Sequence, residues 1–226
     1  MIKTSPGGGC IRAYIPFKAN GAKSRLSKIL NRKERQMLAS LMLEDVLISL
    51  RSSRLDAITL LSTASDGITE IVKSHGIKCR IDDRDLNTAI NSILKEDTDP
   101  VMIVMSDLPL LKSSEIDRIL EFEEDIVIAP GLGGGTNILL VRSPKSFHVD
   151  YHGNSLQDHL NIAKESGLSV RIYHSFLAAV DIDEATDLVE LLIHSDGRAS
   201  SYIRNLGFYL VENDGRVTVK REVENA

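Results

Sequence analysis

Short apolar runs alternate with longer segments in which apolar residues recur every three or four positions, and this alternation most narrows what the chain can fold into. The runs predict strands at Ile11–Phe17, Ile58–Leu61, Lys78–Ile81, Val101–Met105 and Ile126–Ala129. The longer segments predict helices at Lys33–Arg51, Gly67–His75, Leu86–Leu94 and from Ser113 onward. Such a succession predicts an α/β fold with a mostly parallel sheet and helices on both of its faces.

The alternation of predicted strands and helices is interrupted after Gly131, where a glycine-rich turn leads directly into a strand. The rest of the chain predicts strands at Thr136–Val141 and Ser169–Tyr173, helices at Leu156–Ser166 and Ala185–Ile193, and a hairpin of Gly207–Val211 with Val217–Lys220, turned by Asn213-Asp214-Gly215. No repeat or linker interrupts this pattern. We therefore expect a flexible segment over residues 1–10 and a single domain over residues 11–226.

Composition excludes several classes of protein. The 226 residues carry a net charge of −5, whereas proteins that read a nucleic-acid backbone are normally basic. No stretch approaches the roughly 20 apolar residues of a membrane span, and the N-terminus lacks the apolar centre of a signal peptide. The two cysteines, Cys10 and Cys79, fit no metal-binding spacing. We expect a cytoplasmic protein with free thiols and with neither a nucleic-acid nor a membrane partner.

Three cations follow the first predicted strand, where Lys18, Lys23 and Arg25 lie in a short loop that leads into a helix. Cationic side chains and free backbone N–H groups at the end of a strand are suited to binding a polyphosphate. The loop therefore predicts a polyphosphate site. The alternative, that these residues are ordinary solvated surface, stays open.

Carboxylates follow two other predicted segments. Asp107 comes directly after the most apolar strand, in a turn that Pro109 stiffens, and ligands of open α/β sheets bind beyond such strand ends. Asp181 and Asp183 alternate in an extended segment, so their side chains point the same way. Together the three predict a Mg²⁺ site on substrate phosphates. The alternative is that Asp107 and Asp183 cap a turn or a helix.

Two further segments offer anion-binding groups. The turn Gly131–Gly135 precedes a strand and therefore fits neither a Walker loop nor a dinucleotide-binding motif, but it lets a ligand approach the backbone, and Thr136 adds a hydroxyl. Gly153 and Ser155 lie at the start of a predicted helix, where backbone N–H groups are free. No serine, cysteine or histidine has a setting that predicts covalent catalysis or a metal site.

Several of these motifs together resemble the 2-phospho-L-lactate guanylyltransferase family, over about residues 11–207. The motifs are Ile15-Pro16-Phe17-Lys18, Ala22-Lys23-Ser24-Arg25-Leu26-Ser27, Asp85-Leu86-Asn87-Thr88-Ala89, Ser106-Asp107-Leu108-Pro109-Leu110-Leu111, Gly135-Thr136-Asn137 and Asp181-Ile182-Asp183. The resemblance implies a Rossmann-like nucleotidyltransferase fold with three α/β/α layers. It also implies a step in the synthesis of the deazaflavin redox coenzyme of methanogenic archaea, in which 2-phospho-L-lactate attacks the α-phosphate of GTP. The products would be lactyl-2-diphospho-5′-guanosine and pyrophosphate; bacterial relatives are associated with phosphoenolpyruvate instead.

The resemblance also implies roles for individual residues. Lys18, Lys23 and Arg25 would bind the triphosphate of GTP and Asn87 its base, with Lys23, Arg25 and Asp107 acting in catalysis. Asp107 with Asp181 or Asp183 would hold Mg²⁺, and the acceptor would be bound by Thr136, Gly153 and Ser155. One departure concerns the acceptor: the glycine expected three residues before Ser155 is His152, with Gly153 one place later. A homodimer is a further expectation.

The expected chemistry needs no general base, because the phosphate of the acceptor is already an anionic nucleophile. Two alternatives stay open on the sequence. The chain is another nucleotidyltransferase, of the molybdenum-cofactor or sugar-phosphate type, or it is a regulatory module that binds a nucleotide without turnover. The acceptor, the base preference, the number of metal ions and the oligomeric state are likewise open.

Overall fold

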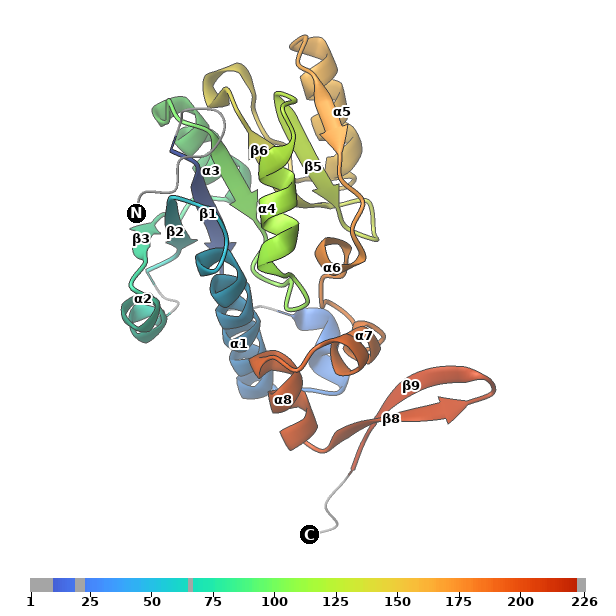
Figure 1. The fold of residues 1–226 in the computed structure, drawn as a ribbon. Coiled ribbons are helices and arrows are strands. Elements are labelled where there is room, and N and C mark those ends of the chain that lie inside the picture. The colour runs from blue at the N-terminus through green and yellow to red at the C-terminus, as the bar shows by residue number, and fades with distance from the viewer. Residues whose placement is uncertain (1–9, 19–22, 65–66, 223–226) are drawn as a thin grey trace.

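Seven strands form one mixed sheet in the order β3-β2-β1-β4-β6-β5-β7 in the computed structural model, which describes residues 10–18, 23–64 and 67–222 (Figure 1). The strands are β1 (Arg12–Phe17), β2 (Ala57–Ser62), β3 (Lys78–Ile81), β4 (Val101–Val104), β5 (Ile126–Pro130), β6 (Thr136–Val141) and β7 (Val170–Ile172). Strand β6 runs antiparallel to β4 and β5, and every other neighbouring pair is parallel. The predicted mostly parallel sheet is confirmed.

The helices agree with the sequence pattern in most places. They are α1 (Arg32–Arg51), α2 (Thr69–His75), α3 (Leu86–Glu96), α4 (Ser113–Glu121), α5 (Ser155–Glu165), α6 (Phe176–Ala179), α7 (Asp187–His194), α8 (Arg198–Asn205) and the 3₁₀ turns η1 (Ser24–Lys28) and η2 (Pro144–Ser146). Helices α6 and α8 were not predicted from the sequence. In the described part of the chain, every helix is too short or too polar to cross a bilayer.

Alternate residues of the central strands enter two separate cores. On β4, Met102 and Val104 pack with α1, α4, α7 and α8, whereas Val101 and Ile103 pack with α3 and α5 on the other face. Because side chains of a strand point alternately to its two faces, a strand covered on both sides must be apolar throughout, as β4 is. The three-layer α/β/α arrangement is confirmed.

The C-terminal strands form the predicted hairpin apart from the main sheet. Strands β8 (Phe208–Asn213) and β9 (Arg216–Arg221) pair with each other and project from the body of the molecule (Figure 1). Asp214 and Gly215 turn the hairpin with φ angles of 50° and 74°. Both angles are positive, which suits an Asp-Gly turn between right-twisted strands.

Helix α8 is held against α1 by a carboxylate. Asp45 of α1 accepts hydrogen bonds from the backbone N–H groups of Arg198 (2.9 Å) and Ala199 (3.0 Å), and so caps the first turn of α8. A Cβ atom on Gly197 would lie 2.7 Å from this carboxylate. A side chain at position 197 would therefore have to displace the carboxylate from its capping position. The contact ties the C-terminal helices to the longest helix of the fold.

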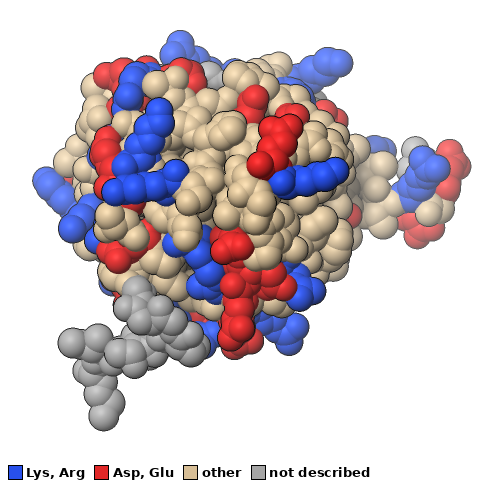
Figure 2. Space-filling view, turned by 90° about the horizontal axis from the view of Figure 1, so that it is seen from above, with Lys and Arg blue, Asp and Glu red and all other residues tan. Residues whose placement is uncertain are grey.

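The predicted flexible segment 1–10 lies outside the described residues, apart from Cys10. The boundaries of the single domain stay a prediction. Cys10 and Cys79 are exposed and free. Lys and Arg side chains lie among Asp and Glu side chains on the face drawn in Figure 2, where no broad basic area is seen. The expectation that nucleic acid is not a partner stays a prediction.

Candidate active site

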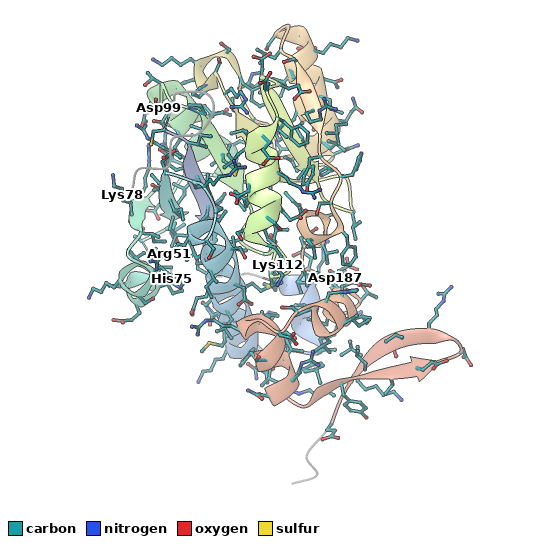
Figure 3. All side chains as sticks on the ribbon, viewed as in Figure 1. Arg51, His75, Lys78, Asp99, Lys112 and Asp187 are labelled. Carbon is teal, nitrogen blue, oxygen red and sulfur yellow. The ribbon has the colours of Figure 1, made fainter. Side chains whose placement is uncertain are left out.

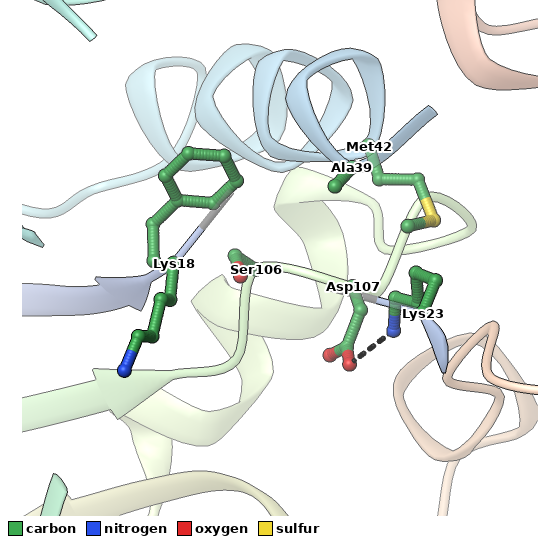
Figure 4. A pocket seen from close by; sticks show the side chains of 7 residues that line it. Lys18, Lys23, Ala39, Met42, Ser106 and Asp107 are labelled. Atoms are coloured by element: carbon green, nitrogen blue, oxygen red, sulfur yellow. Dashed lines mark hydrogen bonds and ion pairs between the residues drawn. The ribbon is translucent and has the colours of Figure 1, made fainter. Parts of the chain in front are cut away.

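Three segments that are distant in the sequence meet at the carboxyl ends of β1 and β4. The Nζ atom of Lys23 lies 2.8 Å from Oδ2 of Asp107 and 2.7 Å from Oδ1 of Asp183 (Figure 4 shows the first of these contacts). The segments also share a backbone hydrogen bond, in which Ile182 N–H donates to the carbonyl of Asp107 at 3.1 Å. The structure therefore brings together the predicted phosphate-binding loop and two of the predicted carboxylates.

The Lys23 ammonium is charged in spite of its burial. Only 7% of the side chain is exposed. Burial by itself lowers the pKa of Lys23, but the negative charges of Asp107 and Asp183 outweigh it, so the pKa lies above its ordinary value. The backbone of Lys23 has φ 55°, a left-handed conformation that costs energy for a residue other than glycine. Strain of this kind is concentrated at functional sites.

The other two predicted cations lie at the rim of the same site. Lys18 and Lys23 line a cavity of about 190 Å³ together with Ser106 and Asp107 (Figure 4). Arg25 is 67% exposed, and its Nη1 atom lies 3.4 Å from Oε1 of Glu184. Lys18 is exposed as well. Lys23 is thus the fixed cation of the site, whereas Lys18 and Arg25 can reorient toward a ligand. Residues 19–22 lie outside the described residues.

Asp183 does not cap the following helix, which was the alternative to a role in the site. Asp187, at the start of α7 (Figure 3), accepts hydrogen bonds from the N–H groups of Asp183 (2.8 Å) and Glu184 (2.6 Å). The carboxylate of Asp183 is therefore free to contact Lys23. The acidic residue in the first turn of α7 stabilises the helix start instead.

The third predicted metal ligand, Asp181, lies half-buried beside the other two. Burial raises the pKa of Asp181 above its ordinary value, and the negative charge of Asp107 raises it further. Carboxylate oxygens are the ligands that Mg²⁺ prefers, so the donor set fits this ion. Over residues 10–18, 23–64 and 67–222, no three Asp, Glu, His or Cys side chains stand close enough together to hold a metal as they are. The metal site stays a prediction.

A second hollow, of about 470 Å³, adjoins the first and was not found from the sequence. The two hollows share Phe17 and Lys18. Apolar residues of β1, β2 and α3 form its walls, and the carboxylate of Asp82 lies at its edge. Arg84 holds that carboxylate, with its Nε atom 2.8 Å from Oδ1, and its hydrogen bonds lower the pKa of Asp82 to about 2. The carboxylate of Asp85 also lines the hollow, so an apolar cleft with carboxylate acceptors continues from the cationic site.

Asn87, predicted to read the base, is not among the residues that line this hollow. Its side-chain oxygen accepts a hydrogen bond from the N–H of Tyr151 at 2.8 Å, and its Nδ2 atom lies 3.1 Å from Nδ1 of His152. The structure therefore places Asn87 under the loop that precedes α5. The same loop carries the unexpected His152 and Gly153, whose φ is 54°.

The hydroxyls of Thr136 and Ser155 are buried, whereas we expected from the sequence that they would be open to a ligand. Each residue is 3% exposed. The Oγ atom of Ser155 accepts a hydrogen bond from Thr136 N–H, and Oγ1 of Thr136 lies 2.9 Å from Nδ1 of His159. The glycine-rich turn packs the start of β6 against the start of α5, which covers both hydroxyls. Their predicted contact with the acceptor stays untested.

His159, which no sequence motif indicated, completes this buried network. The N–H of Asp150 donates to Nε2 of His159 at 3.1 Å, so the hydrogen of the neutral ring is on Nδ1 and is donated to Thr136. Burial lowers the pKa of His159 to about 4, so the ring is neutral at pH 7. The histidine therefore links the loop before α5 to the start of β6.

Comparisons with known proteins find relatives along almost the whole chain. The chain is 45% identical over 217 residues to the 2-phospho-L-lactate guanylyltransferase of Methanoregula boonei, covering 96% of this chain and 98% of that protein. It is 45% identical over 207 residues to the enzyme of that name from Methanosarcina mazei, covering 92% and 98%. A solved nucleotidyl transferase from Methanothermobacter thermautotroptrophicus has a TM-score of 0.61 at 12% identity and covers 88% of this chain and 100% of that chain.

The last of these likenesses concerns the fold alone, and it confirms the predicted nucleotidyltransferase fold. A sequence model of the family described as guanylyl transferase CofC like matches residues 11–225. Because this match spans nearly the whole chain and the curated relatives span it as well, the chain belongs to the guanylyl transferase CofC like family.

Proposed function

We propose that this chain transfers GMP from GTP to 2-phospho-L-lactate, giving lactyl-2-diphospho-5′-guanosine and pyrophosphate. The relatives carry the name of this activity. The observation that carries the proposal is the buried Lys23 ammonium between Asp107 and Asp183, at the sheet edge where α/β proteins bind nucleotides. Deazaflavin coenzyme synthesis, a cytoplasmic location and a homodimer stay predictions that accompany it.

GTP fits the two adjoining hollows in one orientation. The apolar hollow of about 470 Å³ is suited to a nucleobase, and the cationic one to the phosphates. Guanine presents N–H donors along one edge, and the carboxylate of Asp82 is an acceptor that Arg84 keeps ionised. In this proposal Asp82 takes the base-reading role that the family resemblance implied for Asn87. The triphosphate then extends past Lys18 toward Lys23 and Arg25.

The transfer itself depends on positioning and charge neutralisation. A phosphate oxygen of the acceptor forms a bond to the α-phosphorus of GTP, the bond to the bridging oxygen of the β-phosphate breaks, and pyrophosphate leaves with the electron pair. Lys23 and Arg25 neutralise the negative charge that grows on the phosphoryl oxygens. Mg²⁺ held by Asp107 with Asp181 or Asp183 would supply further positive charge at the phosphates.

We place the acceptor on the surface where the glycine-rich turn and the start of α5 meet. Gly153, with its left-handed backbone, lies in the loop at this edge. The buried hydroxyls of Thr136 and Ser155 hold the turn and the helix start together, and so shape the site. Phosphoenolpyruvate has the same phosphate and carboxylate groups and is the second acceptor to test.

The experiment is pyrophosphate release by the purified chain with Mg²⁺, one nucleoside triphosphate and one acceptor. GTP with 2-phospho-L-lactate is expected to give the fastest release, and mass spectrometry should identify the diphosphate product. Turnover with phosphoenolpyruvate alone would change the acceptor and leave guanylyl transfer in place. Turnover with sugar phosphates alone, or GTP binding without turnover, would contradict the proposal.

A further inference from the structure

The side chain of Asn137 is bonded to the segment that carries Asp181. Asn137 lies on β6 and is 6% exposed. Its Nδ2 atom lies 3.0 Å from the carbonyl oxygen of Ala178 and 3.2 Å from that of Ala179. The same atom lies 3.4 Å from Oδ1 of Asp181. A single amide group thus donates to the chain leading into Asp181 and to the carboxylate itself.

The opposite side of this amide is packed against the glycine-rich turn. A Cβ atom on Gly131 would lie 2.7 Å from Oδ1 of Asn137. The turn is closed by the hydrogen bond from Gly131 N–H to Gly135, and Leu132 N–H donates to Ala179. The absence of a side chain at Gly131 therefore lets the amide approach the backbone, and the turn prevents it from swinging away.

The backbone of Asn137 is bonded to the segment that leads to Asp107. Its carbonyl accepts a hydrogen bond from Met105 N–H at 2.9 Å, two residues before Asp107. The carbonyl of Asp107 in turn accepts from Ile182 N–H. One residue therefore fixes both the strand that leads to Asp107 and the orientation of the Asp181 carboxylate.

We propose that Asn137 is a positioning residue that sets Asp181 for a divalent cation shared with Asp107. This inference rests on the proposed metal site. An amide suits the place because its NH₂ group adds no charge, and its two hydrogens, one of them shared, serve the three nearby oxygen acceptors. An aspartate there would face Asp181 with a second negative charge. A serine would be too short to reach the carboxylate and would leave buried carbonyls unpaired.

The experiment is titration of the full chain with Mn²⁺, followed by electron paramagnetic resonance, with an α,β-methylene analogue of GTP present. The variants are Asn137→Ser and Asn137→Asp. The matched control is Asn91→Ser, because the Asn91 amide also bonds backbone groups, at 3.0 Å and 2.8 Å, but far from the carboxylates. Both Asn137 variants are expected to bind Mn²⁺ about 10- to 100-fold more weakly, the usual cost of losing a residue that orients a metal ligand. The control is expected to bind as the wild type does.

Activity supplies a second readout. The Mg²⁺ concentration for half-maximal rate should rise by the same factor in Asn137→Ser, and high Mg²⁺ should restore kcat, which a general loss of stability would not allow. If neither Asn137 variant folds, Gly131→Ala tests the proposal instead. Its methyl group displaces the Asn137 amide and should also weaken Mn²⁺ binding. A folded variant with wild-type Mn²⁺ affinity overturns the role of Asn137 alone. An active wild type that binds no Mn²⁺ overturns the metal proposal and this inference with it.

Discussion

The ammonium of Lys23 lies 2.7 Å from the carboxylate of Asp183, although 160 positions separate the two residues in the sequence. Lys23 enters the site from the loop after β1, whereas Asp183 follows α6 beyond the last strand of the main sheet. Their contact therefore forms only when the sheet is complete. It also explains why the loop after β1 holds a lysine in a left-handed conformation, since the contacts with Asp183 and Asp107 offset the backbone strain.

Replacing Lys23 by alanine is expected to lower kcat/KM with GTP by about 10²- to 10³-fold, the usual cost of removing one group that stabilises charge in a transition state. Arg25→Ala should have a smaller effect, mainly on the KM for GTP, because Arg25 is 67% exposed and loosely paired. Steady-state kinetics with GTP varied at saturating acceptor measure both. Unchanged GTP kinetics in both variants would contradict a role in GTP binding and would show that Lys23 and Arg25 are ordinary surface residues.

Asp107→Ala is expected to lower turnover by at least ~10-fold through the loss of a metal ligand. The variant should fold, because Asp107 is partly exposed and Asp183 still pairs with Lys23. Turnover measured across a range of Mg²⁺, with circular dichroism as the folding control, checks this. A folded variant with near-normal turnover would remove Asp107 from the proposed metal site.

Protonation of His159 is expected to destabilise the fold in acid. Its pKa is about 4 in the folded protein and 6.5 in its ordinary state, so the unfolded chain binds more protons between these values. The stabilisation is therefore complete above pH 6.5 and is lost as the pH falls toward 4, by about 1.4 kcal/mol per pH unit. Urea unfolding at several pH values measures it.

His159→Gln is the control for this pH dependence, since glutamine keeps a polar side chain without titrating. The difference in unfolding free energy between the two proteins should shrink as the pH falls below 6.5. A difference that stays constant from neutral pH down to about pH 4 would contradict the buried neutral ring.

Much of the site was predictable, because the carboxyl ends of parallel strands share one edge of a sheet. The residues after β1 and β4 had to lie near each other once those strands paired, and Lys23 and Asp107 do. Asp82 was overlooked because it follows a weak, mostly exposed strand with little apolar pattern. Sequence patterns therefore indicate which strand ends meet more readily than which side chains line the cleft.

Contacts between segments that are distant in the sequence limit what could be predicted from it. Helix α8 begins without a capping side chain of its own, and its cap is Asp45, 153 positions earlier. No local sequence signal therefore indicated its start. The burial of the Thr136 and Ser155 hydroxyls was not foreseen for the same reason, since it depends on the packing of a turn against a helix start.

Gly197→Ala is expected to destabilise the protein by about 1–3 kcal/mol, because its methyl group displaces the carboxylate that caps α8. Gly133→Ala is the matched control, since a Cβ atom there has no neighbour within 4 Å. Thermal unfolding of both variants tests the claim. Equal melting temperatures would show that the Asp45 cap adjusts without cost.

Removing the buried hydroxyls should separate a role in shaping the acceptor site from a role in folding alone. Ser155→Ala leaves Thr136 N–H without its acceptor, and Thr136→Val leaves the Nδ1–H of His159 unpaired, each at a cost of about 1–3 kcal/mol in stability. If the turn and helix start shape the acceptor site, both variants should also raise the KM for the phospholactate acceptor more than the KM for GTP. A change confined to positioning would leave kcat at saturating acceptor little altered.

Kinetics measured at a temperature well below the unfolding midpoint separate the effect on acceptor binding from the effect on stability. Equal increases in both KM values, or a loss of stability with no change in kinetics, would move the acceptor away from this part of the molecule.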